Sequence, residues 1–288
     1  MALSIAGCAL TVACARGPAA PALVPKPASA LGEERGPAVS EDGVPQALTA
    51  PEASDWVSED DFTVRVITDA ITCTGALIAP DLVLTAHHCV AARSSQGDIV
   101  ERDVTSSEVT VELGGDRFPL GEAGVRSVVS PPCGYSGGAG DLAILVLSRS
   151  LPGLPHRAVE LERMPRAGDS VIPLGFGRCA GTNDGIYRKR RAATPLHVVQ
   201  EGRMLLDAAI CPGDSGGPAL SSSTGRVVGV VSRSVMDADE ATLGFTELSR
   251  LDGFRELFAA AAQVARGTSR AELPPIECPV MGGRTSQR

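Results

Sequence analysis

Residues 73–89 read CTGALIAPDLVLTAHHC, and this stretch decides how the rest of the chain is interpreted. Its apolar run, ALIAPDLVLTA, is rich in Leu, Ile and Val and contains a Pro-Asp pair, which is typical of β-structure with a turn. The stretch ends in two adjacent histidines and a cysteine, although only four histidines occur among 288 residues. Any function assigned to the chain should account for these two adjacent histidines.

The same β-rich texture continues along the chain. Many short strands and few helical periods predict an all-β fold, built as a sandwich or as a pair of barrels. One helix is predicted at residues 254–267, with Asp252 capping its start and Gly267 ending it. The β-branched runs, separated by turn signals such as GG, PPCG and GAGD, are FTVRVITD, VTVEL, VRSVVS, LAILVL, SVIPLG and RVVGVVS.

Composition narrows the class of protein. Hydrophobic residues make up 43% and charged residues 21%, as in ordinary globular proteins. Aromatic residues reach only 3%, so the core must consist mainly of Val, Leu, Ile and Ala. A net charge of −8 argues against a general nucleic-acid binder, which needs a basic face. Eight cysteines indicate an oxidising compartment.

The N-terminal region has the character of a targeting segment followed by a linker. Residues 1–14 are apolar and rich in small residues, like a secretory signal. IAGC, ending at Cys8, and TVAC, ending at Cys14, resemble the lipobox of bacterial lipoproteins; a simple cleaved signal without lipid is the alternative. Residues 15–58 are rich in Ala, Pro and Gly and are predicted to form an extended linker or propeptide.

A second decisive stretch is CPGDSGGP at residues 211–218. A serine among glycines lies where the backbone turns tightly and offers N–H groups to a developing negative charge. This arrangement suits a nucleophile beside an oxyanion hole. Taken alone, it is equally compatible with a polar, glycine-rich turn.

Three stretches together resemble the trypsin/chymotrypsin-like serine proteases. CTGALIAPDLVLTAHHC is similar to the family's segment around its histidine, GDLAIL at residues 140–145 to that around its aspartate, and CPGDSGGP to that around its serine. Their order is that of chymotrypsin. The resemblance covers roughly residues 60–266 and implies a bacterial, secreted protease of two six-stranded antiparallel β-barrels with a C-terminal α-helix.

The resemblance assigns roles residue by residue. His88, the histidine directly before the cysteine, is the base, Asp141 orients it, and Ser215 is the nucleophile. The backbone N–H groups of Gly213 and Ser215 form the oxyanion hole. Ser232 falls where the family has a serine that supports the aspartate. His87 occupies a position that is usually small.

The resemblance also implies disulfides and a substrate pocket. Cys73 and Cys89 are the expected pair. In the chain-entropy model, a disulfide that closes a loop of this size stabilises the fold by about 3 kcal/mol. The competing interpretation of HHC as zinc ligands lacks a second cluster with metal spacing, so no metal or cofactor is expected. The remaining assignments are Cys179 with Cys211, Cys133 with Cys278 by elimination, and a pocket formed by Ala209, Ser232, Ser234 and Gly244, with Arg233 beside it. Because Ala209 stands where trypsins carry Asp, cleavage after Lys or Arg is not expected.

Two features depart from the family or remain open. The resemblance implies activation by a cleavage that frees an IVGG-like terminus, whose amine then pairs with the aspartate before the nucleophile, here Asp214. No such motif occurs within residues 35–62, so Asp214 is held by something else, activation uses another signal, or a zymogen step is absent. The basic run RKRRA at residues 188–192 is expected at the edge of an exposed loop and strand, with a processing site as the alternative. The acids Glu101, Asp103 and Glu108 are expected to be solvated, with calcium binding as the alternative.

The predicted function is that of a serine endopeptidase acting on peptides or proteins outside the cytoplasm, secreted or lipid-anchored at the bacterial envelope. The alternatives are a catalytically silent homologue acting as a binding module, and an esterase of the same fold. No nucleic-acid partner is expected, and the sequence leaves the oligomeric state open. The predicted divisions are residues 1–14, 15–58, the protease domain at 59–267, and a tail at 268–288.

Overall fold

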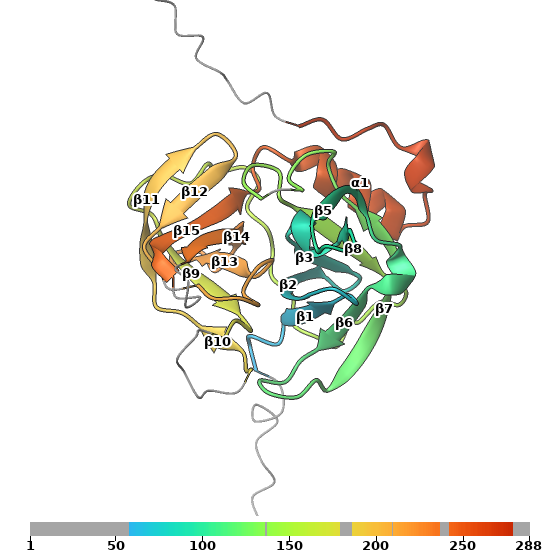
Figure 1. Cartoon of the computed structure of the whole chain (residues 1–288), viewed down its shortest axis with the longest axis horizontal. Coiled ribbons are helices and arrows are strands. Elements are labelled where there is room, and N and C mark those ends of the chain that lie inside the picture. Colours follow the sequence, from blue (N-terminus) through green and yellow to red (C-terminus); the bar gives the residue numbers. More distant parts are fainter. Residues whose placement is uncertain (1–57, 136, 179–185, 209, 237–241, 279–288) are drawn as a thin grey trace, which may run out of the picture. The chain divides into compact units, whose positions relative to one another are not determined.

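The computed structural model describes residues 58–278, apart from residues 136, 179–185, 209 and 237–241, and describes no side chains within 235–244. All of the described residues belong to one compact unit within residues 51–288 (Figure 1). The predicted signal segment, the linker up to residue 57 and the end of the tail therefore lie outside the described residues.

The first barrel closes on itself with every neighbouring pair antiparallel. In β6 (Thr110–Leu113) of this barrel, as in β12 (Arg203–Leu206) of the second, buried and less buried residues alternate, which is the period of a strand with one face on a core. The first barrel holds, in order, β1 (Thr63–Ile67), β2 (Thr72–Ala79), β3 (Leu82–Thr85), β8 (Ala143–Leu147), β7 (Gly121–Val129) and β6 (Thr110–Leu113), which returns to β1.

The second barrel closes through the pairing of β13 (Pro218–Ser221) with β9 (Ser170–Gly175). A short strand, β10 (Lys189–Arg190), is added to β9 outside the ring. The ring holds β9 (Ser170–Gly175), β11 (Thr194–Gln200), β12 (Arg203–Leu206), β15 (Thr242–Arg250), β14 (Val227–Met236) and β13 (Pro218–Ser221). The predicted pair of six-stranded antiparallel barrels is confirmed (Figure 1).

Smaller elements complete the description. β4 (Ala91–Arg93) and β5 (Ile99–Asp103) form a two-stranded ribbon. The 3₁₀ turns are η3 (His87–Cys89), η4 (Ser106–Glu108) and η5 (Arg270–Glu272). As expected from the composition, the buried core consists mostly of Val, Leu, Ile and Ala, with Phe62 and Phe254 among its largest side chains.

The helix α1 (Arg255–Ala265) packs against β8, β7 and β3 of the first barrel. It begins after Phe254, so the prediction that Asp252 caps it is wrong: the Asp252 carboxylate instead accepts hydrogen bonds from Arg250, at 3.1 and 2.6 Å. Gly267 follows the helix with a φ of 104°, which confirms it as the end signal. Among the described residues, no helix has the length and apolar character needed to cross a bilayer.

Candidate active site

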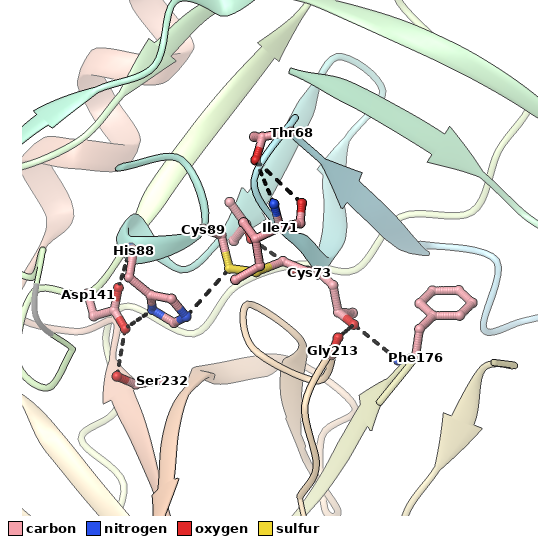
Figure 2. The surroundings of a disulfide bond; sticks show 11 residues. Thr68, Ile71, Cys73, His88, Cys89, Asp141, Phe176, Gly213 and Ser232 are labelled. Carbon is pink, nitrogen blue, oxygen red and sulfur yellow. Dashed lines mark hydrogen bonds and ion pairs between the residues drawn. A yellow bond between two sulfur atoms is a disulfide. The ribbon is translucent and has the colours of Figure 1, made fainter. Parts of the chain in front are cut away.

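The register of the first barrel brings His88 next to Asp141. β3 and β8 pair antiparallel with Thr85 opposite Ala143, so the residues after Thr85 and before Ala143 leave the barrel at the same end. There the Nδ1 atom of His88 lies 2.8 Å from Oδ2 of Asp141, and the His88 backbone N–H donates to Oδ1 at 2.9 Å (Figure 2). Asp141 thus holds both the ring and the backbone of His88.

The carboxylate of Asp141 is fully buried, and it receives a further hydrogen bond from the second barrel. Ser232, on β14, donates from Oγ to Oδ2 of Asp141 at 2.6 Å, and Ser232 itself accepts from the Gly138 N–H at 2.9 Å. Three donors therefore compensate the buried charge. With Asp141 ionised, Nδ1 of His88 carries its hydrogen, which leaves the Nε2 lone pair to accept a proton.

Ser215 lies at the seam of the two barrels. Its carbonyl accepts from the Thr74 N–H of β2 at 2.8 Å, while the next residue, Gly216, donates to Val231 of β14 at 2.8 Å. Gly216 has a φ of 83°, and a Cβ there would lie 2.2 Å from the Thr74 carbonyl oxygen. A glycine after the serine is therefore required by the close approach of the two barrels.

The structure joins His88, Asp141 and Ser232 but shows no hydrogen bond from Ser215 to His88. Within the described part of the chain, the Ser215 hydroxyl has no hydrogen-bond partner, and the neighbour of His88 Nε2 is Sγ of Cys89 at 3.7 Å (Figure 2). A disulfide sulfur at that distance is a weak partner. In proteins without substrate, catalytic hydrogen bonds are commonly loose and tighten on binding.

The loop before Ser215 presents two uncommitted backbone donors. Among the described residues, neither the Gly213 nor the Ser215 N–H donates to an acceptor. The Pro212 carbonyl accepts from the Arg178 N–H at 3.0 Å, and the next carbonyl, of Gly213, accepts from Oγ1 of Thr74 at 2.6 Å. Because N–H and C=O of a trans peptide point in opposite directions, the Gly213 N–H is directed away from Arg178. This orientation leaves it available to an oxyanion.

His87 has a separate partner that the sequence reasoning missed. Its ring is fully buried, with Nε2 2.7 Å from Oδ1 of Asp103 and Nδ1 2.8 Å from the Cys133 carbonyl oxygen. Ser130 donates to the other oxygen of Asp103 at 2.6 Å, and Tyr135 packs on the ring with centroids 4.0 Å apart. The histidine type at position 87 and the acid on β5 were the available signals, but nothing local links them.

The electrostatics of this cluster follow from its hydrogen bonds. Burial alone raises the pKa of Asp103, but hydrogen bonds from His87 and Ser130 outweigh it and hold that pKa below its ordinary 3.8. Burial, followed by the charge of Asp103 and a hydrogen bond to it, raises the pKa of Tyr135 to about 12. Asp103 is therefore an ionised, structural partner of His87 rather than a solvated acid.

The proposed calcium ligands do not converge on one site. Asp103 is used by His87, and Glu108 instead accepts from the backbone and hydroxyl of Thr105 at the start of η4, at 2.7 and 2.6 Å. Among the described residues, the group whose atoms approach within metal-binding range is Cys73, His88 and Cys89. The two sulfurs are bonded to each other, so neither is a thiolate in this state. The absence of a metal stays a prediction.

Two of the expected disulfides are present in the described part of the chain. Cys73 pairs with Cys89 across the histidine segment, and Cys133 pairs with Cys278. Cys211 is disulfide-bonded, while its predicted partner, Cys179, lies outside the described residues.

The pocket residues are described only in part. Ala209 and the Gly244 side-chain position lie outside the description. The Ser234 hydroxyl hydrogen-bonds Oγ1 of Thr246 at 3.0 Å, and the hydroxyl of Ser232 is committed to Asp141, with 2% of the residue exposed. Arg233 keeps 56% of its side chain exposed while pairing with Glu247 at 3.2 Å. The assignment of these residues to a pocket stays a prediction.

A family model described as Trypsin matches residues 55–251, which cover both barrels. The chain belongs to the trypsin family of serine proteases. Relatives of this trypsin-family chain include serine protease SP24D of Anopheles gambiae, 31% identical over 56% of this chain and 62% of the relative. The cercarial protease of Schistosoma mansoni is 29% identical over 62% of this chain and 76% of the relative. Trypsin iota of Drosophila melanogaster is 27% identical over 58% and 70%, respectively.

Solved structures support the fold of this trypsin-family chain. Neuropsin of mouse brain matches 70% of the chain and 95% of its own length, with a TM-score of 0.55 and 19% identity. A mutant of human heparin binding protein matches 70% and 92%, with a TM-score of 0.56 and 20% identity. At such identities the likeness concerns the fold alone, and fold does not by itself specify function.

Proposed function

We propose that this trypsin-family chain is a secreted serine endopeptidase in which Ser215 is the nucleophile and His88 the general base. The observation that carries the proposal is the buried chain from Ser232 through Asp141 to His88, at 2.6 and 2.8 Å. This chain fixes the tautomer of the imidazole and leaves its Nε2 without a strong partner. A substrate-free site of this kind is prepared to accept a proton.

The reaction proceeds through an acyl-enzyme. The Ser215 hydroxyl attacks the carbonyl carbon of the scissile bond while its proton passes to Nε2 of His88. The N–H groups of Gly213 and Ser215 bind the resulting oxyanion. Collapse of the tetrahedral intermediate breaks the C–N bond, and His88 returns the proton to the leaving amine. Water then attacks the carbonyl carbon of the acyl-enzyme ester while His88 takes its proton. Collapse of this second intermediate releases the acid product, and His88 returns the proton to the Ser215 oxygen. Asp141 stabilises the His88 imidazolium in both half-reactions.

The finer assignments belong to the same proposal. The substrates are peptides or proteins, and the neutral residue Ala209, which the family resemblance assigns to the base of the pocket, favours an apolar side chain over Lys or Arg. Lipid anchoring at Cys8 or Cys14 of a bacterial envelope rests on the N-terminal sequence alone, because the relatives named above come from animals. An esterase would use the same machinery.

The test is active-site labelling of the full chain, expressed in an oxidising compartment. A fluorophosphonate probe should label Ser215, as located by peptide mapping, and the Ser215→Ala variant should remain unlabelled. A matched peptide and ester then separate endopeptidase from esterase activity through kcat/KM. If a folded protein, checked by circular dichroism, is labelled in no form, the silent binding module replaces the proposal.

A further inference from the structure

The carboxylate of Asp214, the residue directly before the proposed nucleophile, is buried and has an internal cation. Only 2% of its side chain is exposed, and its partner is the guanidinium of Arg191, which is itself 18% exposed. The two oxygens of Asp214 also accept from the Gly177 N–H at 2.8 Å and from the Cys211 N–H at 3.0 Å. A buried carboxylate with three donors is compensated, whereas removing its cation would leave an uncompensated charge.

The surrounding backbone is shaped around this carboxylate. A Cβ at Gly175 would lie 2.2 Å from Oδ1 of Asp214, and a Cβ at Gly177 would lie 2.3 Å from its Cγ. No larger residue fits at either position without displacing the carboxyl group. Asp214 thereby ties the start of the loop at Cys211 to the end of β9. The adjacent Arg178 N–H, in turn, orients the Pro212 carbonyl and with it the Gly213 N–H.

The backbone of Arg191 is fixed to β9, and the Asp214 carboxylate is bound just beyond the end of that strand, at the Gly177 N–H. It follows β10, and its backbone N–H donates to the Pro173 carbonyl of β9 at 2.9 Å. The side chain therefore reaches Asp214 from a backbone position that is itself hydrogen-bonded to β9. Its cationic group can hold the carboxylate without any change elsewhere in the chain.

The other arginines of the basic run hold the first described residues. Arg188 pairs with Asp61 at 2.6 Å, and Arg190 pairs with Asp60 at 2.6 Å. The prediction of an exposed basic run is wrong for Arg188, of which only 8% is exposed. The segment that leads into β1 is thus held by ion pairs at Asp60 and Asp61, while Arg191, the third arginine of the run, pairs with Asp214.

We propose that Arg191 is a positioning residue that holds Asp214, and through it the oxyanion loop of residues 211–215, in the competent arrangement without a newly released N-terminus. This inference rests on the proposed function, because it concerns the same site. It explains why the sequence carries no IVGG-like terminus within residues 35–62. A cation built into the chain does what the family resemblance assigns to a freed amine.

The experiment compares Arg191→Gln, Arg191→Lys and the matched control Arg190→Gln in the full chain. Fluorophosphonate labelling rates, together with kcat and KM on a peptide substrate, are measured for each folded variant. Arg191→Gln should lose about 10²–10³-fold in labelling rate and kcat, as for loss of an oxyanion donor, with a smaller change in KM. Arg191→Lys keeps the charge and should restore much of the loss, and Arg190→Gln should match the wild type.

Intact-mass measurement of the labelled wild type gives a second readout that does not depend on any variant folding. Labelled species should retain an N-terminus upstream of residue 36. Labelling only of species cleaved between residues 36 and 60 would overturn the inference while leaving the protease function standing. Equal rates for wild type and a folded Arg191→Gln would do the same. No labelling of any species would instead remove the proposed function, and the inference with it.

Discussion

Two His–Asp–Ser hydrogen-bond chains begin at adjacent residues at one end of the first barrel. One joins His87, Asp103 and Ser130, and the other joins His88, Asp141 and Ser232. One nitrogen of each ring lies 2.7 or 2.8 Å from a carboxylate, and each carboxylate accepts a hydrogen bond from a serine hydroxyl at 2.6 Å. The difference is the second ring nitrogen. In His87 it faces the Cys133 carbonyl within a fully buried ring, whereas in His88 it faces only Cys89 Sγ and 13% of the side chain is exposed.

With His88 as the proposed base, the comparison implies that a His–Asp pair is not in itself a catalytic signature. Both rings are oriented by a carboxylate, but only His88 retains an accessible nitrogen that can take a proton from a nucleophile. The two nitrogens of the His87 ring face the Cys133 carbonyl and the Asp103 carboxylate. These contacts hold the ribbon β4–β5 to the barrel. Matched substitutions in the two chains can test this division between catalysis and folding.

The largest difference is expected between the histidines themselves. His88→Gln should lower kcat on a peptide substrate by about 10⁶-fold, since loss of the general base removes the function of the whole triad. His87→Gln should retain kcat within about tenfold while lowering the melting temperature, because a buried hydrogen-bonded group is lost. An equal loss of kcat in a folded His87→Gln protein would refute the division.

The carboxylates should differ almost as much. Asp141→Asn is expected to lower kcat by about 10⁴-fold, because an amide favours the wrong tautomer of His88. Asp103→Asn should leave kcat close to that of the wild type. Steady-state kinetics below the melting temperature of both variants provide the measurement. Similar kcat losses in the two would mean that the Asp103 chain shapes the site after all.

A smaller separation is expected between the two serines. Ser232→Ala removes a hydrogen bond to the buried carboxylate of Asp141 and should lower kcat roughly 10- to 100-fold, from the usual strength of bonds to charged groups. Ser130→Ala removes the equivalent bond to Asp103 and should lower thermal stability without a comparable kinetic effect. A kcat for Ser232→Ala equal to that for Ser130→Ala would show that Asp141 needs no support.

Local sequence patterns predicted several of the strands, whereas the pair of six-stranded barrels was implied by the family resemblance. The runs around Val64, Leu145 and Val230 are β-branched and apolar enough to predict buried strands, and the runs lie in β1, β8 and β14. Strands β11 and β15 carry polar residues such as His197 and Glu247 and gave no comparable signal. Their pairing depends on neighbours distant in sequence, which no local period encodes.

The charged partners were the part that the sequence did not predict. Asp103 lies 16 residues from His87, and Arg191 lies 23 residues from Asp214. In a single sequence, none of these charged residues can be told apart from the charged residues of an ordinary surface loop. Only the closure of the barrels brings each pair together and buries it, so neither the second histidine chain nor the internal cation could be predicted from spacing alone.

The smallest expected effect is a dependence of stability on pH that belongs to the His87 chain. The pKa of Asp103 in the folded protein lies below its ordinary 3.8, so ionised Asp103 stabilises the fold above that value, and the stabilisation is lost as the pH falls through the folded pKa. Asp103→Asn should therefore lower the free energy of unfolding by about 1–3 kcal/mol at pH 7, and the difference should shrink below pH 3.8. Urea unfolding between pH 7 and pH 3 measures this, with Glu101→Gln, an exposed neighbour on β5, as the control. If the difference in unfolding free energy between wild type and Asp103→Asn stays constant over this range, the hydrogen bonds to Asp103 do not depend on its charge. The two hydrogen-bond chains would then differ in more than the second ring nitrogen of their histidines.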